Sequence, residues 1–478
     1  ANHQHLDAGH FQLYYKGILA SDSGQYDSYN SNHDKQYNKE TIAHNTLLIY
    51  NPSESMGSGI INSGGQRRPG GEPPTMAVWI TNNDNYRIGE VLEHGFGPDT
   101  ITPEYTYIKG DITRAYSNKV SEVLRSMLFM PTEDTNYPAL FFVMDKVTST
   151  NPTFKKTWLL HTQEEPTKSN NTITVKRTKQ RSGNTYYDGR RHVQSLLPQG
   201  ADITLIGGAG DEFNINGTNY APASSSGTAN EPGWGRVEIS PATASATDYF
   251  LNVMCVSDNS KNLSSLPATL IETDTLAGTK ISNYVAIFNK NRNRINAPIQ
   301  FTIPGSEPDG LKIVVAGVKE GIWNIYKNSD LLTSEIASLD GGTLYFDGGA
   351  GDYSIVRIQS AIQTKLTSLT YDNSENIYTS GQFNYNVMLP YGASTIPLVS
   401  ATAEYSTANV VITQATSIPG VATVVVTGED STSQTYTISF TLPEEESNSL
   451  LSLSYTYNGK IVPIELKHDS FDITLQKN

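Results

Sequence analysis

Histidines gather near the start of this sequence, and their types and spacing could do chemistry. His3, His5 and His10 are followed by His33 and His44, so five of the nine histidines fall in the first 44 residues. Imidazole is a common zinc ligand and the usual proton carrier near neutral pH. The cluster therefore indicates a metal site, acid–base catalysis, or both.

Short strands are predicted to position these side chains. The strands are expected at residues 11–15, 17–20 and 42–50. If residues 3–5 are extended, His3 and His5 point to the same face, because side chains alternate along a strand. Neighbouring strand ends could then bring His5, Asp22 and His44 together as a zinc set of two imidazoles and one carboxylate. Residue types alone leave open an alternative, in which these are satisfied polar residues at sheet edges.

Two stretches carry a resemblance to a known family. The runs Asn2–Gly17 and Thr41–Tyr50 are similar to the start of the central β-domain of heparinase II/III-type polysaccharide lyases, most closely the heparinase II branch. In that family the first histidine of the His-x-His pair takes part in β-elimination, which implies that His3 is catalytic. The second histidine, an aspartate on the next strand and the histidine of the Ala-His-Asn segment hold a zinc ion that is mainly structural. The resemblance implies that these ligands are His5, Asp22 and His44.

Two further segments are candidates for substrate binding. Residues 27–40 form a polar loop, and long polar loops between strands tend to carry binding residues, so Tyr29 is our candidate there. The alternative is a surface tyrosine that packs on its own loop. Gln66 and Arg67 resemble a family loop near the cleft, and the alternative for them is a solvated loop rich in glycine and proline.

Charge and cysteine content exclude several classes of protein. A net charge of −14 makes the chain a poor binder of nucleic acid or anionic membranes. Any positive field must be local, and the basic residues at 176–181 and 190–192 read as a solvated hairpin or a ligand contact. The single cysteine, Cys255, excludes an internal disulfide framework, and its apolar neighbours predict a buried, inert thiol. The sequence contains no apolar run of about 18 residues, so it predicts no membrane span.

Composition and periodicity predict an all-β chain of several domains. Glycine, proline and tyrosine number 38, 23 and 27, and alternating segments such as 76–80 and 120–129 read as strands. We expect a large two-layer antiparallel β-sandwich followed by smaller β-sandwich domains. The expected domains are a central lyase β-sandwich at 1–275, the small C-terminal sheet domain of the lyase at 276–365, a cadherin-like module at 366–442, and a linker with the start of a second module at 443–478.

The resemblance also implies partners and a location. An α/α toroid normally precedes this β-domain and contributes a tyrosine to the cleft. We expect it to be absent from this chain, because residue 1 lies inside the motif. The implied substrate is an acidic polysaccharide, and the implied location is secreted, periplasmic or on the surface of a bacterial cell. A homodimer remains open.

The function expected from the resemblance is β-elimination on a uronic-acid-containing glycan, with heparin or heparan sulfate favoured. Alginate or another uronate glycan is the alternative substrate. Two rival functions remain open from the residues alone. One is metal-assisted hydrolysis with Asp7 as general base. The other is a non-catalytic glycan-binding or scaffold protein.

Overall fold

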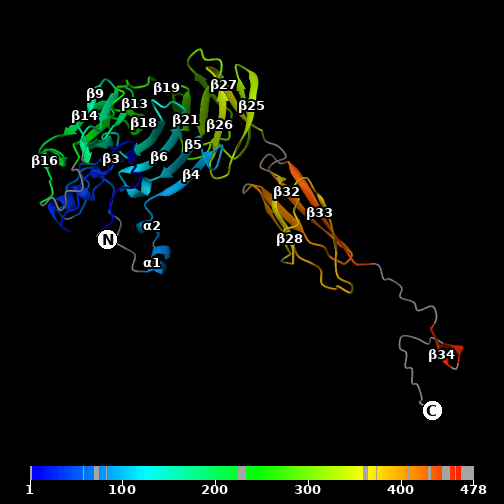
Figure 1. Cartoon of the computed structure of the whole chain (residues 1–478). Coiled ribbons are helices and arrows are strands. Elements are labelled where there is room, and N and C mark those ends of the chain that lie inside the picture. Colours follow the sequence, from blue (N-terminus) through cyan, green and yellow to red (C-terminus); the bar gives the residue numbers. More distant parts are fainter. Residues whose placement is uncertain are drawn as a thin grey trace. The chain divides into compact units, whose positions relative to one another are not determined.

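The computed structural model confirms an all-β chain (Figure 1). It describes residues 3–57, 59–68, 75–81, 83–182, 184–223, 233–358, 364–372, 374–405, 408–428, 432–443, 453–457 and 459–464. The chain divides into two compact units, residues 1–358 and 359–478. None of the described helices is long and apolar enough to cross a membrane.

The first sandwich of unit 1 consists of an eight-stranded and a four-stranded sheet. The larger sheet has the order β4 (Glu90–Gly97), β5 (Tyr105–Asp111), β6 (Val120–Pro131), β7 (Ala139–Ser149), β18 (Thr247–Asp258), β13 (Gly189–Leu197), β10 (Thr172–Lys176), β9 (Thr167–Ser169). The smaller sheet has the order β14 (Asp202–Gly207), β17 (Gly235–Ser240), β8 (Lys155–Thr162), β3 (Leu47–Tyr50). All of these neighbouring pairs are antiparallel.

The second sandwich of unit 1 is smaller. One sheet has the order β19 (Ala268–Glu272), β20 (Leu276–Ile281), β21 (Tyr284–Asn289), β23 (Leu311–Ala316), β26 (Thr343–Gly348). The other has the order β22 (Ile299–Ile303), β27 (Gly351–Ile358), β24 (Gly321–Lys327), β25 (Asp330–Ala337). The expected boundary at 275/276 falls between β19 and β20, although these two strands pair in one sheet.

Three hydrophobic cores stack these four sheets into consecutive layers. Along β7, Val143 and Val147 belong to the core inside the first sandwich, whereas Phe142 and Met144 belong to the core shared with the five-stranded sheet. This follows from the two-residue period of a strand, and it explains why β7 is apolar on both faces. A third core, which includes Trp323, fills the second sandwich.

Short elements decorate the first sandwich. The hairpins pair β1 (Leu13–Tyr14) with β2 (Ile18–Ala20), β11 (Gln180–Ser182) with β12 (Thr185–Tyr186), and β15 (Asn214–Ile215) with β16 (Thr218–Asn219). The short helices are η1 (Asp34–Asn38), η2 (Thr41–Ala43), η3 (Thr113–Ala115), α1 (Met76–Thr81) and α2 (Asn83–Tyr86).

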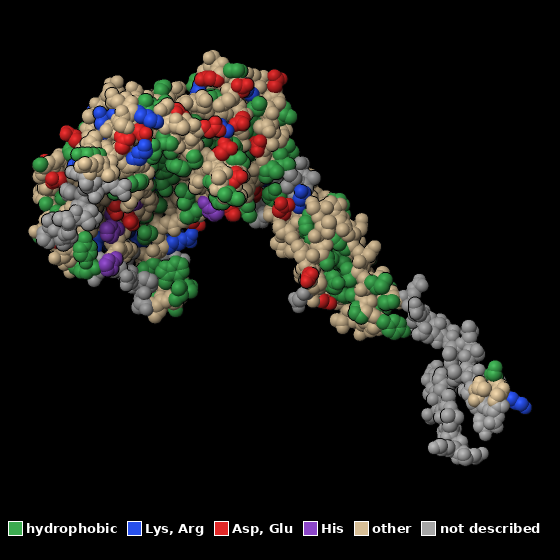
Figure 2. All heavy atoms as spheres, viewed as in Figure 1, with side chains coloured by type: hydrophobic (Ala, Val, Ile, Leu, Met, Phe, Trp, Pro, Cys, Tyr) green, Lys and Arg blue, Asp and Glu red, His purple; other side chains and the backbone are tan. Residues whose placement is uncertain are grey.

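Two predicted strands were wrong in whole or in part. Residues 76–80 form helix α1, because a short apolar run does not separate helix from strand by periodicity. The Thr75 hydroxyl accepts a hydrogen bond from the Val78 N–H (3.2 Å), which caps this helix. Its apolar side chains are exposed, and Figure 2 shows them as a green group. The strand expected at 42–50 begins only at Leu47, because η2 precedes it and the polar residues between them turn toward the candidate site.

Unit 2 contains one β-sandwich and a hairpin. Its sheets are β28 (Leu366–Tyr371) with β30 (Val399–Ala403), and β29 (Asn384–Met388), β33 (Ser433–Thr441), β32 (Gly420–Thr427), β31 (Asn409–Thr413) in that order. Strand β29 pairs with β33 in parallel. The hairpin joins β34 (Leu453–Tyr457) and β35 (Lys460–Ile464). This unit has its own hydrophobic core, which includes Tyr436 and Phe440.

Candidate active site and metal centre

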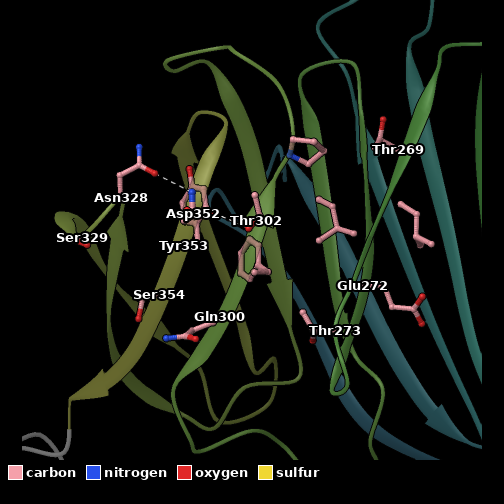
Figure 3. Close-up of a pocket in the computed structure, with 14 residues that line it drawn as sticks. Thr269, Glu272, Thr273, Gln300, Thr302, Asn328, Ser329, Asp352, Tyr353 and Ser354 are labelled. Atoms are coloured by element: carbon pink, nitrogen blue, oxygen red, sulfur yellow. Dashed lines mark hydrogen bonds between the residues drawn. The ribbon is translucent and has the colours of Figure 1, made fainter.

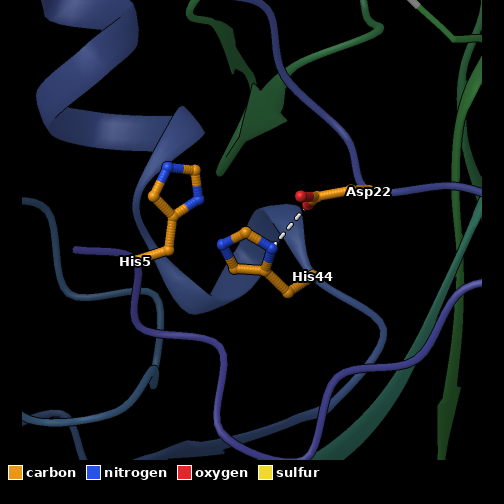
Figure 4. Close-up of side chains that lie close together, drawn as sticks. All are labelled: His5, Asp22 and His44. Atoms are coloured by element: carbon orange, nitrogen blue, oxygen red, sulfur yellow. Dashed lines mark hydrogen bonds and ion pairs between the residues drawn. The ribbon is translucent and has the colours of Figure 1, made fainter. Parts of the chain in front are cut away.

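Three side chains from separate segments meet at the start of unit 1. His5 comes from the irregular chain before β1, Asp22 follows β2, and His44 follows η2 (Figure 4). One ligand atom from each lies within 4.8 Å of the other two. His44 is buried, His5 is half-buried, and the side chain of Asp22 is 37% exposed. These are the three residues that the sequence predicted as metal ligands.

The donor set fits a zinc ion. The Nδ1–H of His44 donates to Asp22 Oδ1 (2.6 Å), whereas His44 Nε2 is buried and has no hydrogen-bond partner among the described residues. A buried polar atom without a partner costs free energy, and a metal ion is one group that would satisfy it. Two imidazoles and a carboxylate are ligands that zinc accepts.

Electrostatics keep these groups ready to bind a cation. Burial, and then the neighbouring His44, lower the pKa of His5, which favours the neutral imidazole. Burial works against ionisation of Asp22, but the hydrogen bond from His44 and the nearby imidazoles outweigh it and lower the pKa of Asp22. A neutral imidazole and an ionised carboxylate are the forms that ligate metals.

His10 is near this cluster but has a different state. Its Nδ1 accepts a hydrogen bond from the Asn45 backbone N–H (2.9 Å), so the proton of the neutral ring is on Nε2. A protonated nitrogen has no lone pair for a metal, so His10 is not a ligand in this geometry. Burial lowers the pKa of His10 to about 4, which keeps the ring neutral at pH 7.

Asn45 joins the three segments that carry the cluster. Its Nδ2 donates to the carbonyl oxygens of Phe11 and Ser21 (both 2.9 Å), and its Oδ1 accepts from the His161 backbone N–H (2.7 Å). The ring of His161 lies within hydrogen-bond distance of two acceptors, Asn45 Oδ1 (3.1 Å) and the Ile42 carbonyl (2.9 Å), and the single N–H of the neutral ring donates to one of them.

A buried ion pair also binds the backbone of the segments that carry the cluster. Arg125 of β6 binds Asp145 of β7 through two hydrogen bonds (2.6 and 3.0 Å), and both side chains are almost fully buried. The same guanidinium donates to the carbonyls of Gly9 (2.6 Å) and Asn45 (2.8 Å). Our sequence reasoning missed this pair. The sequence gives little signal for it, because each strand carries a second charged residue, Glu122 in β6 and Lys146 in β7.

The candidate catalytic residue His3 contacts the candidate substrate residue Tyr29. The Tyr29 hydroxyl lies 3.0 Å from His3 Nε2, and the two rings are edge to face. Both side chains are exposed. The Lys39 ammonium lies 5.2 Å from the centroid of the Tyr29 ring, and Tyr26 packs against its edge. An imidazole and a phenol in hydrogen-bond contact on an open surface can exchange a proton with a bound molecule.

The two residues from the Gly/Pro-rich loop lie differently. Gln66 is 1% exposed, and its amide bonds both the N–H (3.0 Å) and the carbonyl (2.8 Å) of Ala8, so it supports the histidine-bearing backbone and has no free group for a substrate. Arg67 is half-buried and donates to the carbonyls of Arg114 (2.8 Å) and Asn85 (3.3 Å).

Two other expectations are decided by burial. Among the basic residues at 176–181 and 190–192, Arg177, Arg190 and Arg191 are at most 3% exposed, whereas Lys176 and Lys179 are exposed. Cys255 is buried, as predicted, and burial raises the pKa of its thiol to about 11.

The second sandwich contains a wide groove without a chemical cluster. The groove has a volume of about 980 Å³ and lies between the edge strands β19 and β22 (Figure 3). Its lining is polar, but Thr302 donates to Asp352 (2.7 Å) and Asn328 accepts from the Asp352 N–H (3.0 Å). None of the histidines lines this groove.

Comparison with known proteins supports the sequence resemblance. Residues 1–226 match the family model of the heparinase II/III-like C-terminal domain, and residues 270–357 match that of the heparinase II C-terminal domain. This chain therefore contains heparinase II/III-like C-terminal domains. The matches do not single out the heparinase II branch. No curated protein matches the chain.

Two solved structures are similar to parts of the chain. One, titled "Heparinase III-BT4657 gene product", is 12% identical, covers 58% of this chain and 35% of its own, and gives a TM-score of 0.36. Another, titled "Crystal Structure of Heparinase III", is 15% identical, covers 59% and 34%, and gives a TM-score of 0.35. This chain thus spans about a third of the length of these two proteins.

Proposed function

We propose that this chain supplies one side of the active site of a polysaccharide lyase that cleaves uronic-acid-containing glycans by β-elimination. The observation that carries the proposal is the hydrogen bond between His3 and Tyr29, on an open surface two residues from the His5 cluster. The match to the heparinase II/III-like family model supports the same reaction class.

The proposed reaction needs a base, an acid and a partner for the carboxylate of the uronate. The base removes the proton at C5, the bond between C4 and the leaving oxygen breaks, a C4–C5 double bond forms, and the acid protonates the leaving oxygen. Imidazole and phenol suit both proton transfers, and each such group contributes about 10²–10⁴-fold. We assign one of these roles to His3, with Tyr29 bound to it as a contact to the substrate and a proton partner. A tyrosine from a preceding toroid would supply the other role.

The proposed metal centre is structural. Bound zinc would link three segments that have little regular secondary structure of their own. His5, Asp22 and His44 would hold it, and Asn45 with Arg125 would keep their backbones in place. His3 lies two residues from His5, so fixing His5 limits the positions that the His3 ring can take.

The proposed substrate is heparin or heparan sulfate, with alginate or another uronate glycan as the alternative. The family supports this class of substrate without selecting one member. The proposed location is outside the cytoplasm of a bacterium, where such glycans are found. A homodimer is also only a proposal.

The lyase proposal is tested with full-length protein and a panel of uronate glycans. The measurement is the ultraviolet absorbance of the unsaturated product. We expect His3→Ala to lower the rate about 10²–10⁴-fold and Tyr29→Phe to lower it less. His94→Ala is the matched control, because His94 is exposed on β4 and lies outside the cluster. Unchanged product formation in His3→Ala would refute the role of His3.

The metal proposal has its own test. We expect His44→Ala to lose most of the zinc that the wild-type protein retains after dialysis, measured by elemental analysis, whereas His94→Ala keeps it. A zinc content that is equal in wild type and His44→Ala would sink the ligand assignment, whatever the catalytic result.

A further inference from the structure

A separate pocket opens beside Asp22. It has a volume of about 330 Å³, and neither His3 nor Tyr29 lines it. Its lining comes from residues 12–38 and 163–187 and includes Gln12, Asp22, Asn38, Gln163, Arg177 and Tyr187. The volume is at the lower end of the range for small-molecule sites, about 300–1,000 Å³, and suits one sugar ring.

Three amide side chains in this pocket have unused hydrogen-bonding groups. Gln163 is 7% exposed, and its Oε1 is buried without a hydrogen-bond partner. Within the described residues, the side chains of Gln12 and Asn38 also make no hydrogen bond. Buried polar groups are nearly always paired, so an unpaired amide oxygen in a pocket wall points to a ligand that brings a donor.

The charge of the pocket indicates which ligand this is. Arg177, the one cation in the lining, binds Glu164 (3.0 Å) and stacks over the Tyr187 ring at 4.4 Å, so its charge is balanced inside the wall. Asp22 contributes a carboxylate to the wall. The wall offers a sulfate or carboxylate group no cation that is not already paired, whereas hydroxyl groups can pair with the amides.

We propose that this pocket is a subsite for an uncharged, hydroxyl-rich sugar unit of the glycan. The proposal rests on the proposed glycan-lyase function and adds a specificity to it. The acidic sugar is bound near His3, and the unit in this pocket is one without sulfate. Amide and carboxylate groups beside an aromatic ring provide the hydrogen bonds and the apolar surface that a sugar ring needs.

Gln163→Leu is the sharpest test, because leucine keeps the size and removes the amide. We expect about tenfold weaker binding of an unsulfated, N-acetylated heparan-type tetrasaccharide to full-length protein carrying His3→Ala, measured by calorimetry. In protein with His3 intact, KM should rise with kcat unchanged, because the contact is made in ground and transition state alike. Thermal stability should not fall, since nothing described in the fold uses this oxygen.

Two controls complete the test. Gln199→Leu makes the same change at an exposed position outside the pocket and should bind like the parent. Asn38→Ala should weaken binding as Gln163→Leu does, which covers the case in which Gln163→Leu disturbs the fold. Wild-type affinity in both pocket variants would overturn the subsite, and so would equally tight, Gln163-dependent binding of a fully sulfated tetrasaccharide. If no glycan yields unsaturated product while Gln163-dependent binding persists, the lyase proposal fails and the subsite stands.

Discussion

The two sandwiches of unit 1 share an architecture but differ in what they bury. In the first, an arginine and an aspartate pair inside the core, and Asp145 is completely shielded from solvent. In the second, the core around Trp323 is aliphatic and aromatic. Glu320 and Arg357 are buried there too, and the buried Lys290 pairs with Glu272, which is still 31% exposed. The sequence of the second sandwich, residues 268–358, contains no histidine.

This difference shows where the fold buries charged groups at a cost in hydration free energy. Burying an ion pair loses more hydration than it returns unless further hydrogen bonds compensate. In the first sandwich these bonds go to the backbone of Gly9 and Asn45, beside His10 and His44. The second sandwich positions no such segment and is held by apolar packing. The Arg125–Asp145 pair therefore lies beside the candidate site, whereas the buried Lys109–Glu93 pair contacts Asn291.

The substitution with the largest expected effect breaks the buried pair of Arg125 and Asp145. Arg125→Met leaves Asp145 buried without its partner and should lower the free energy of unfolding by about 3–5 kcal/mol, measured by urea denaturation. Retained zinc should fall as well, because Gly9 and Asn45 lose their donor. Arg87→Met is the control, since its pair with Glu90 is exposed and is worth about 0–1 kcal/mol. Equal stability of the two variants would contradict the comparison.

A truncated side chain in the core of the second sandwich should lower the free energy of unfolding without changing the zinc content. Ile325→Ala removes a fully buried side chain and should cost about 2–5 kcal/mol in free energy of unfolding. Zinc content and product formation under native conditions should match wild type. Loss of zinc in the folded variant would show that the two sandwiches are not separable in this way.

Asn45→Ala tests the link between the segments more gently. The variant removes the amide that binds Phe11 and Ser21, so metal affinity should fall about 10–100-fold, measured by competition with a chelator. Asn171→Ala, which removes a single bond to the Ser195 carbonyl at the other end of the sheet, should keep wild-type affinity. If both variants bind zinc alike, Asn45 is not a support of the metal centre.

Acid should weaken the first sandwich selectively, and this is the smallest expected effect. Burial, and then Arg190, lower the pKa of His192 to about 4, below the unfolded value near 6.5. The unfolded chain then binds the extra proton, so this contribution is complete above pH 6.5 and is lost as pH falls toward 4. One such group changes stability by up to about 1.4 kcal/mol per pH unit. His192→Gln should flatten the stability curve between about pH 6 and 5, and an unchanged slope would refute this assignment.

Much of the candidate site follows from residue identities near the start of the chain. The spacing of His5, Asp22 and His44 predicted that they meet, and their ligand atoms do lie within 4.8 Å of one another. The path of the chain that brings His44 to this cluster was only partly predicted. The polar residues before Leu47 bind neighbours across the fold and do not continue a strand. Helix α1 was missed because its pattern is too short to separate two periodicities.

The sequence by itself determined the all-β class, the resemblance to heparinase II/III-like domains and the candidate residues for chemistry, because composition, alternation and motif identity are local properties. Tertiary structure alone decided how each polar group is used. It turned Gln66 toward Ala8, placed Asn45 between three segments, buried the Arg125–Asp145 pair beneath them and left Gln163 with an unpaired oxygen. The physical reason is that burial and hydrogen-bond pairing depend on which segments become neighbours in space, and one-dimensional spacing does not contain that information.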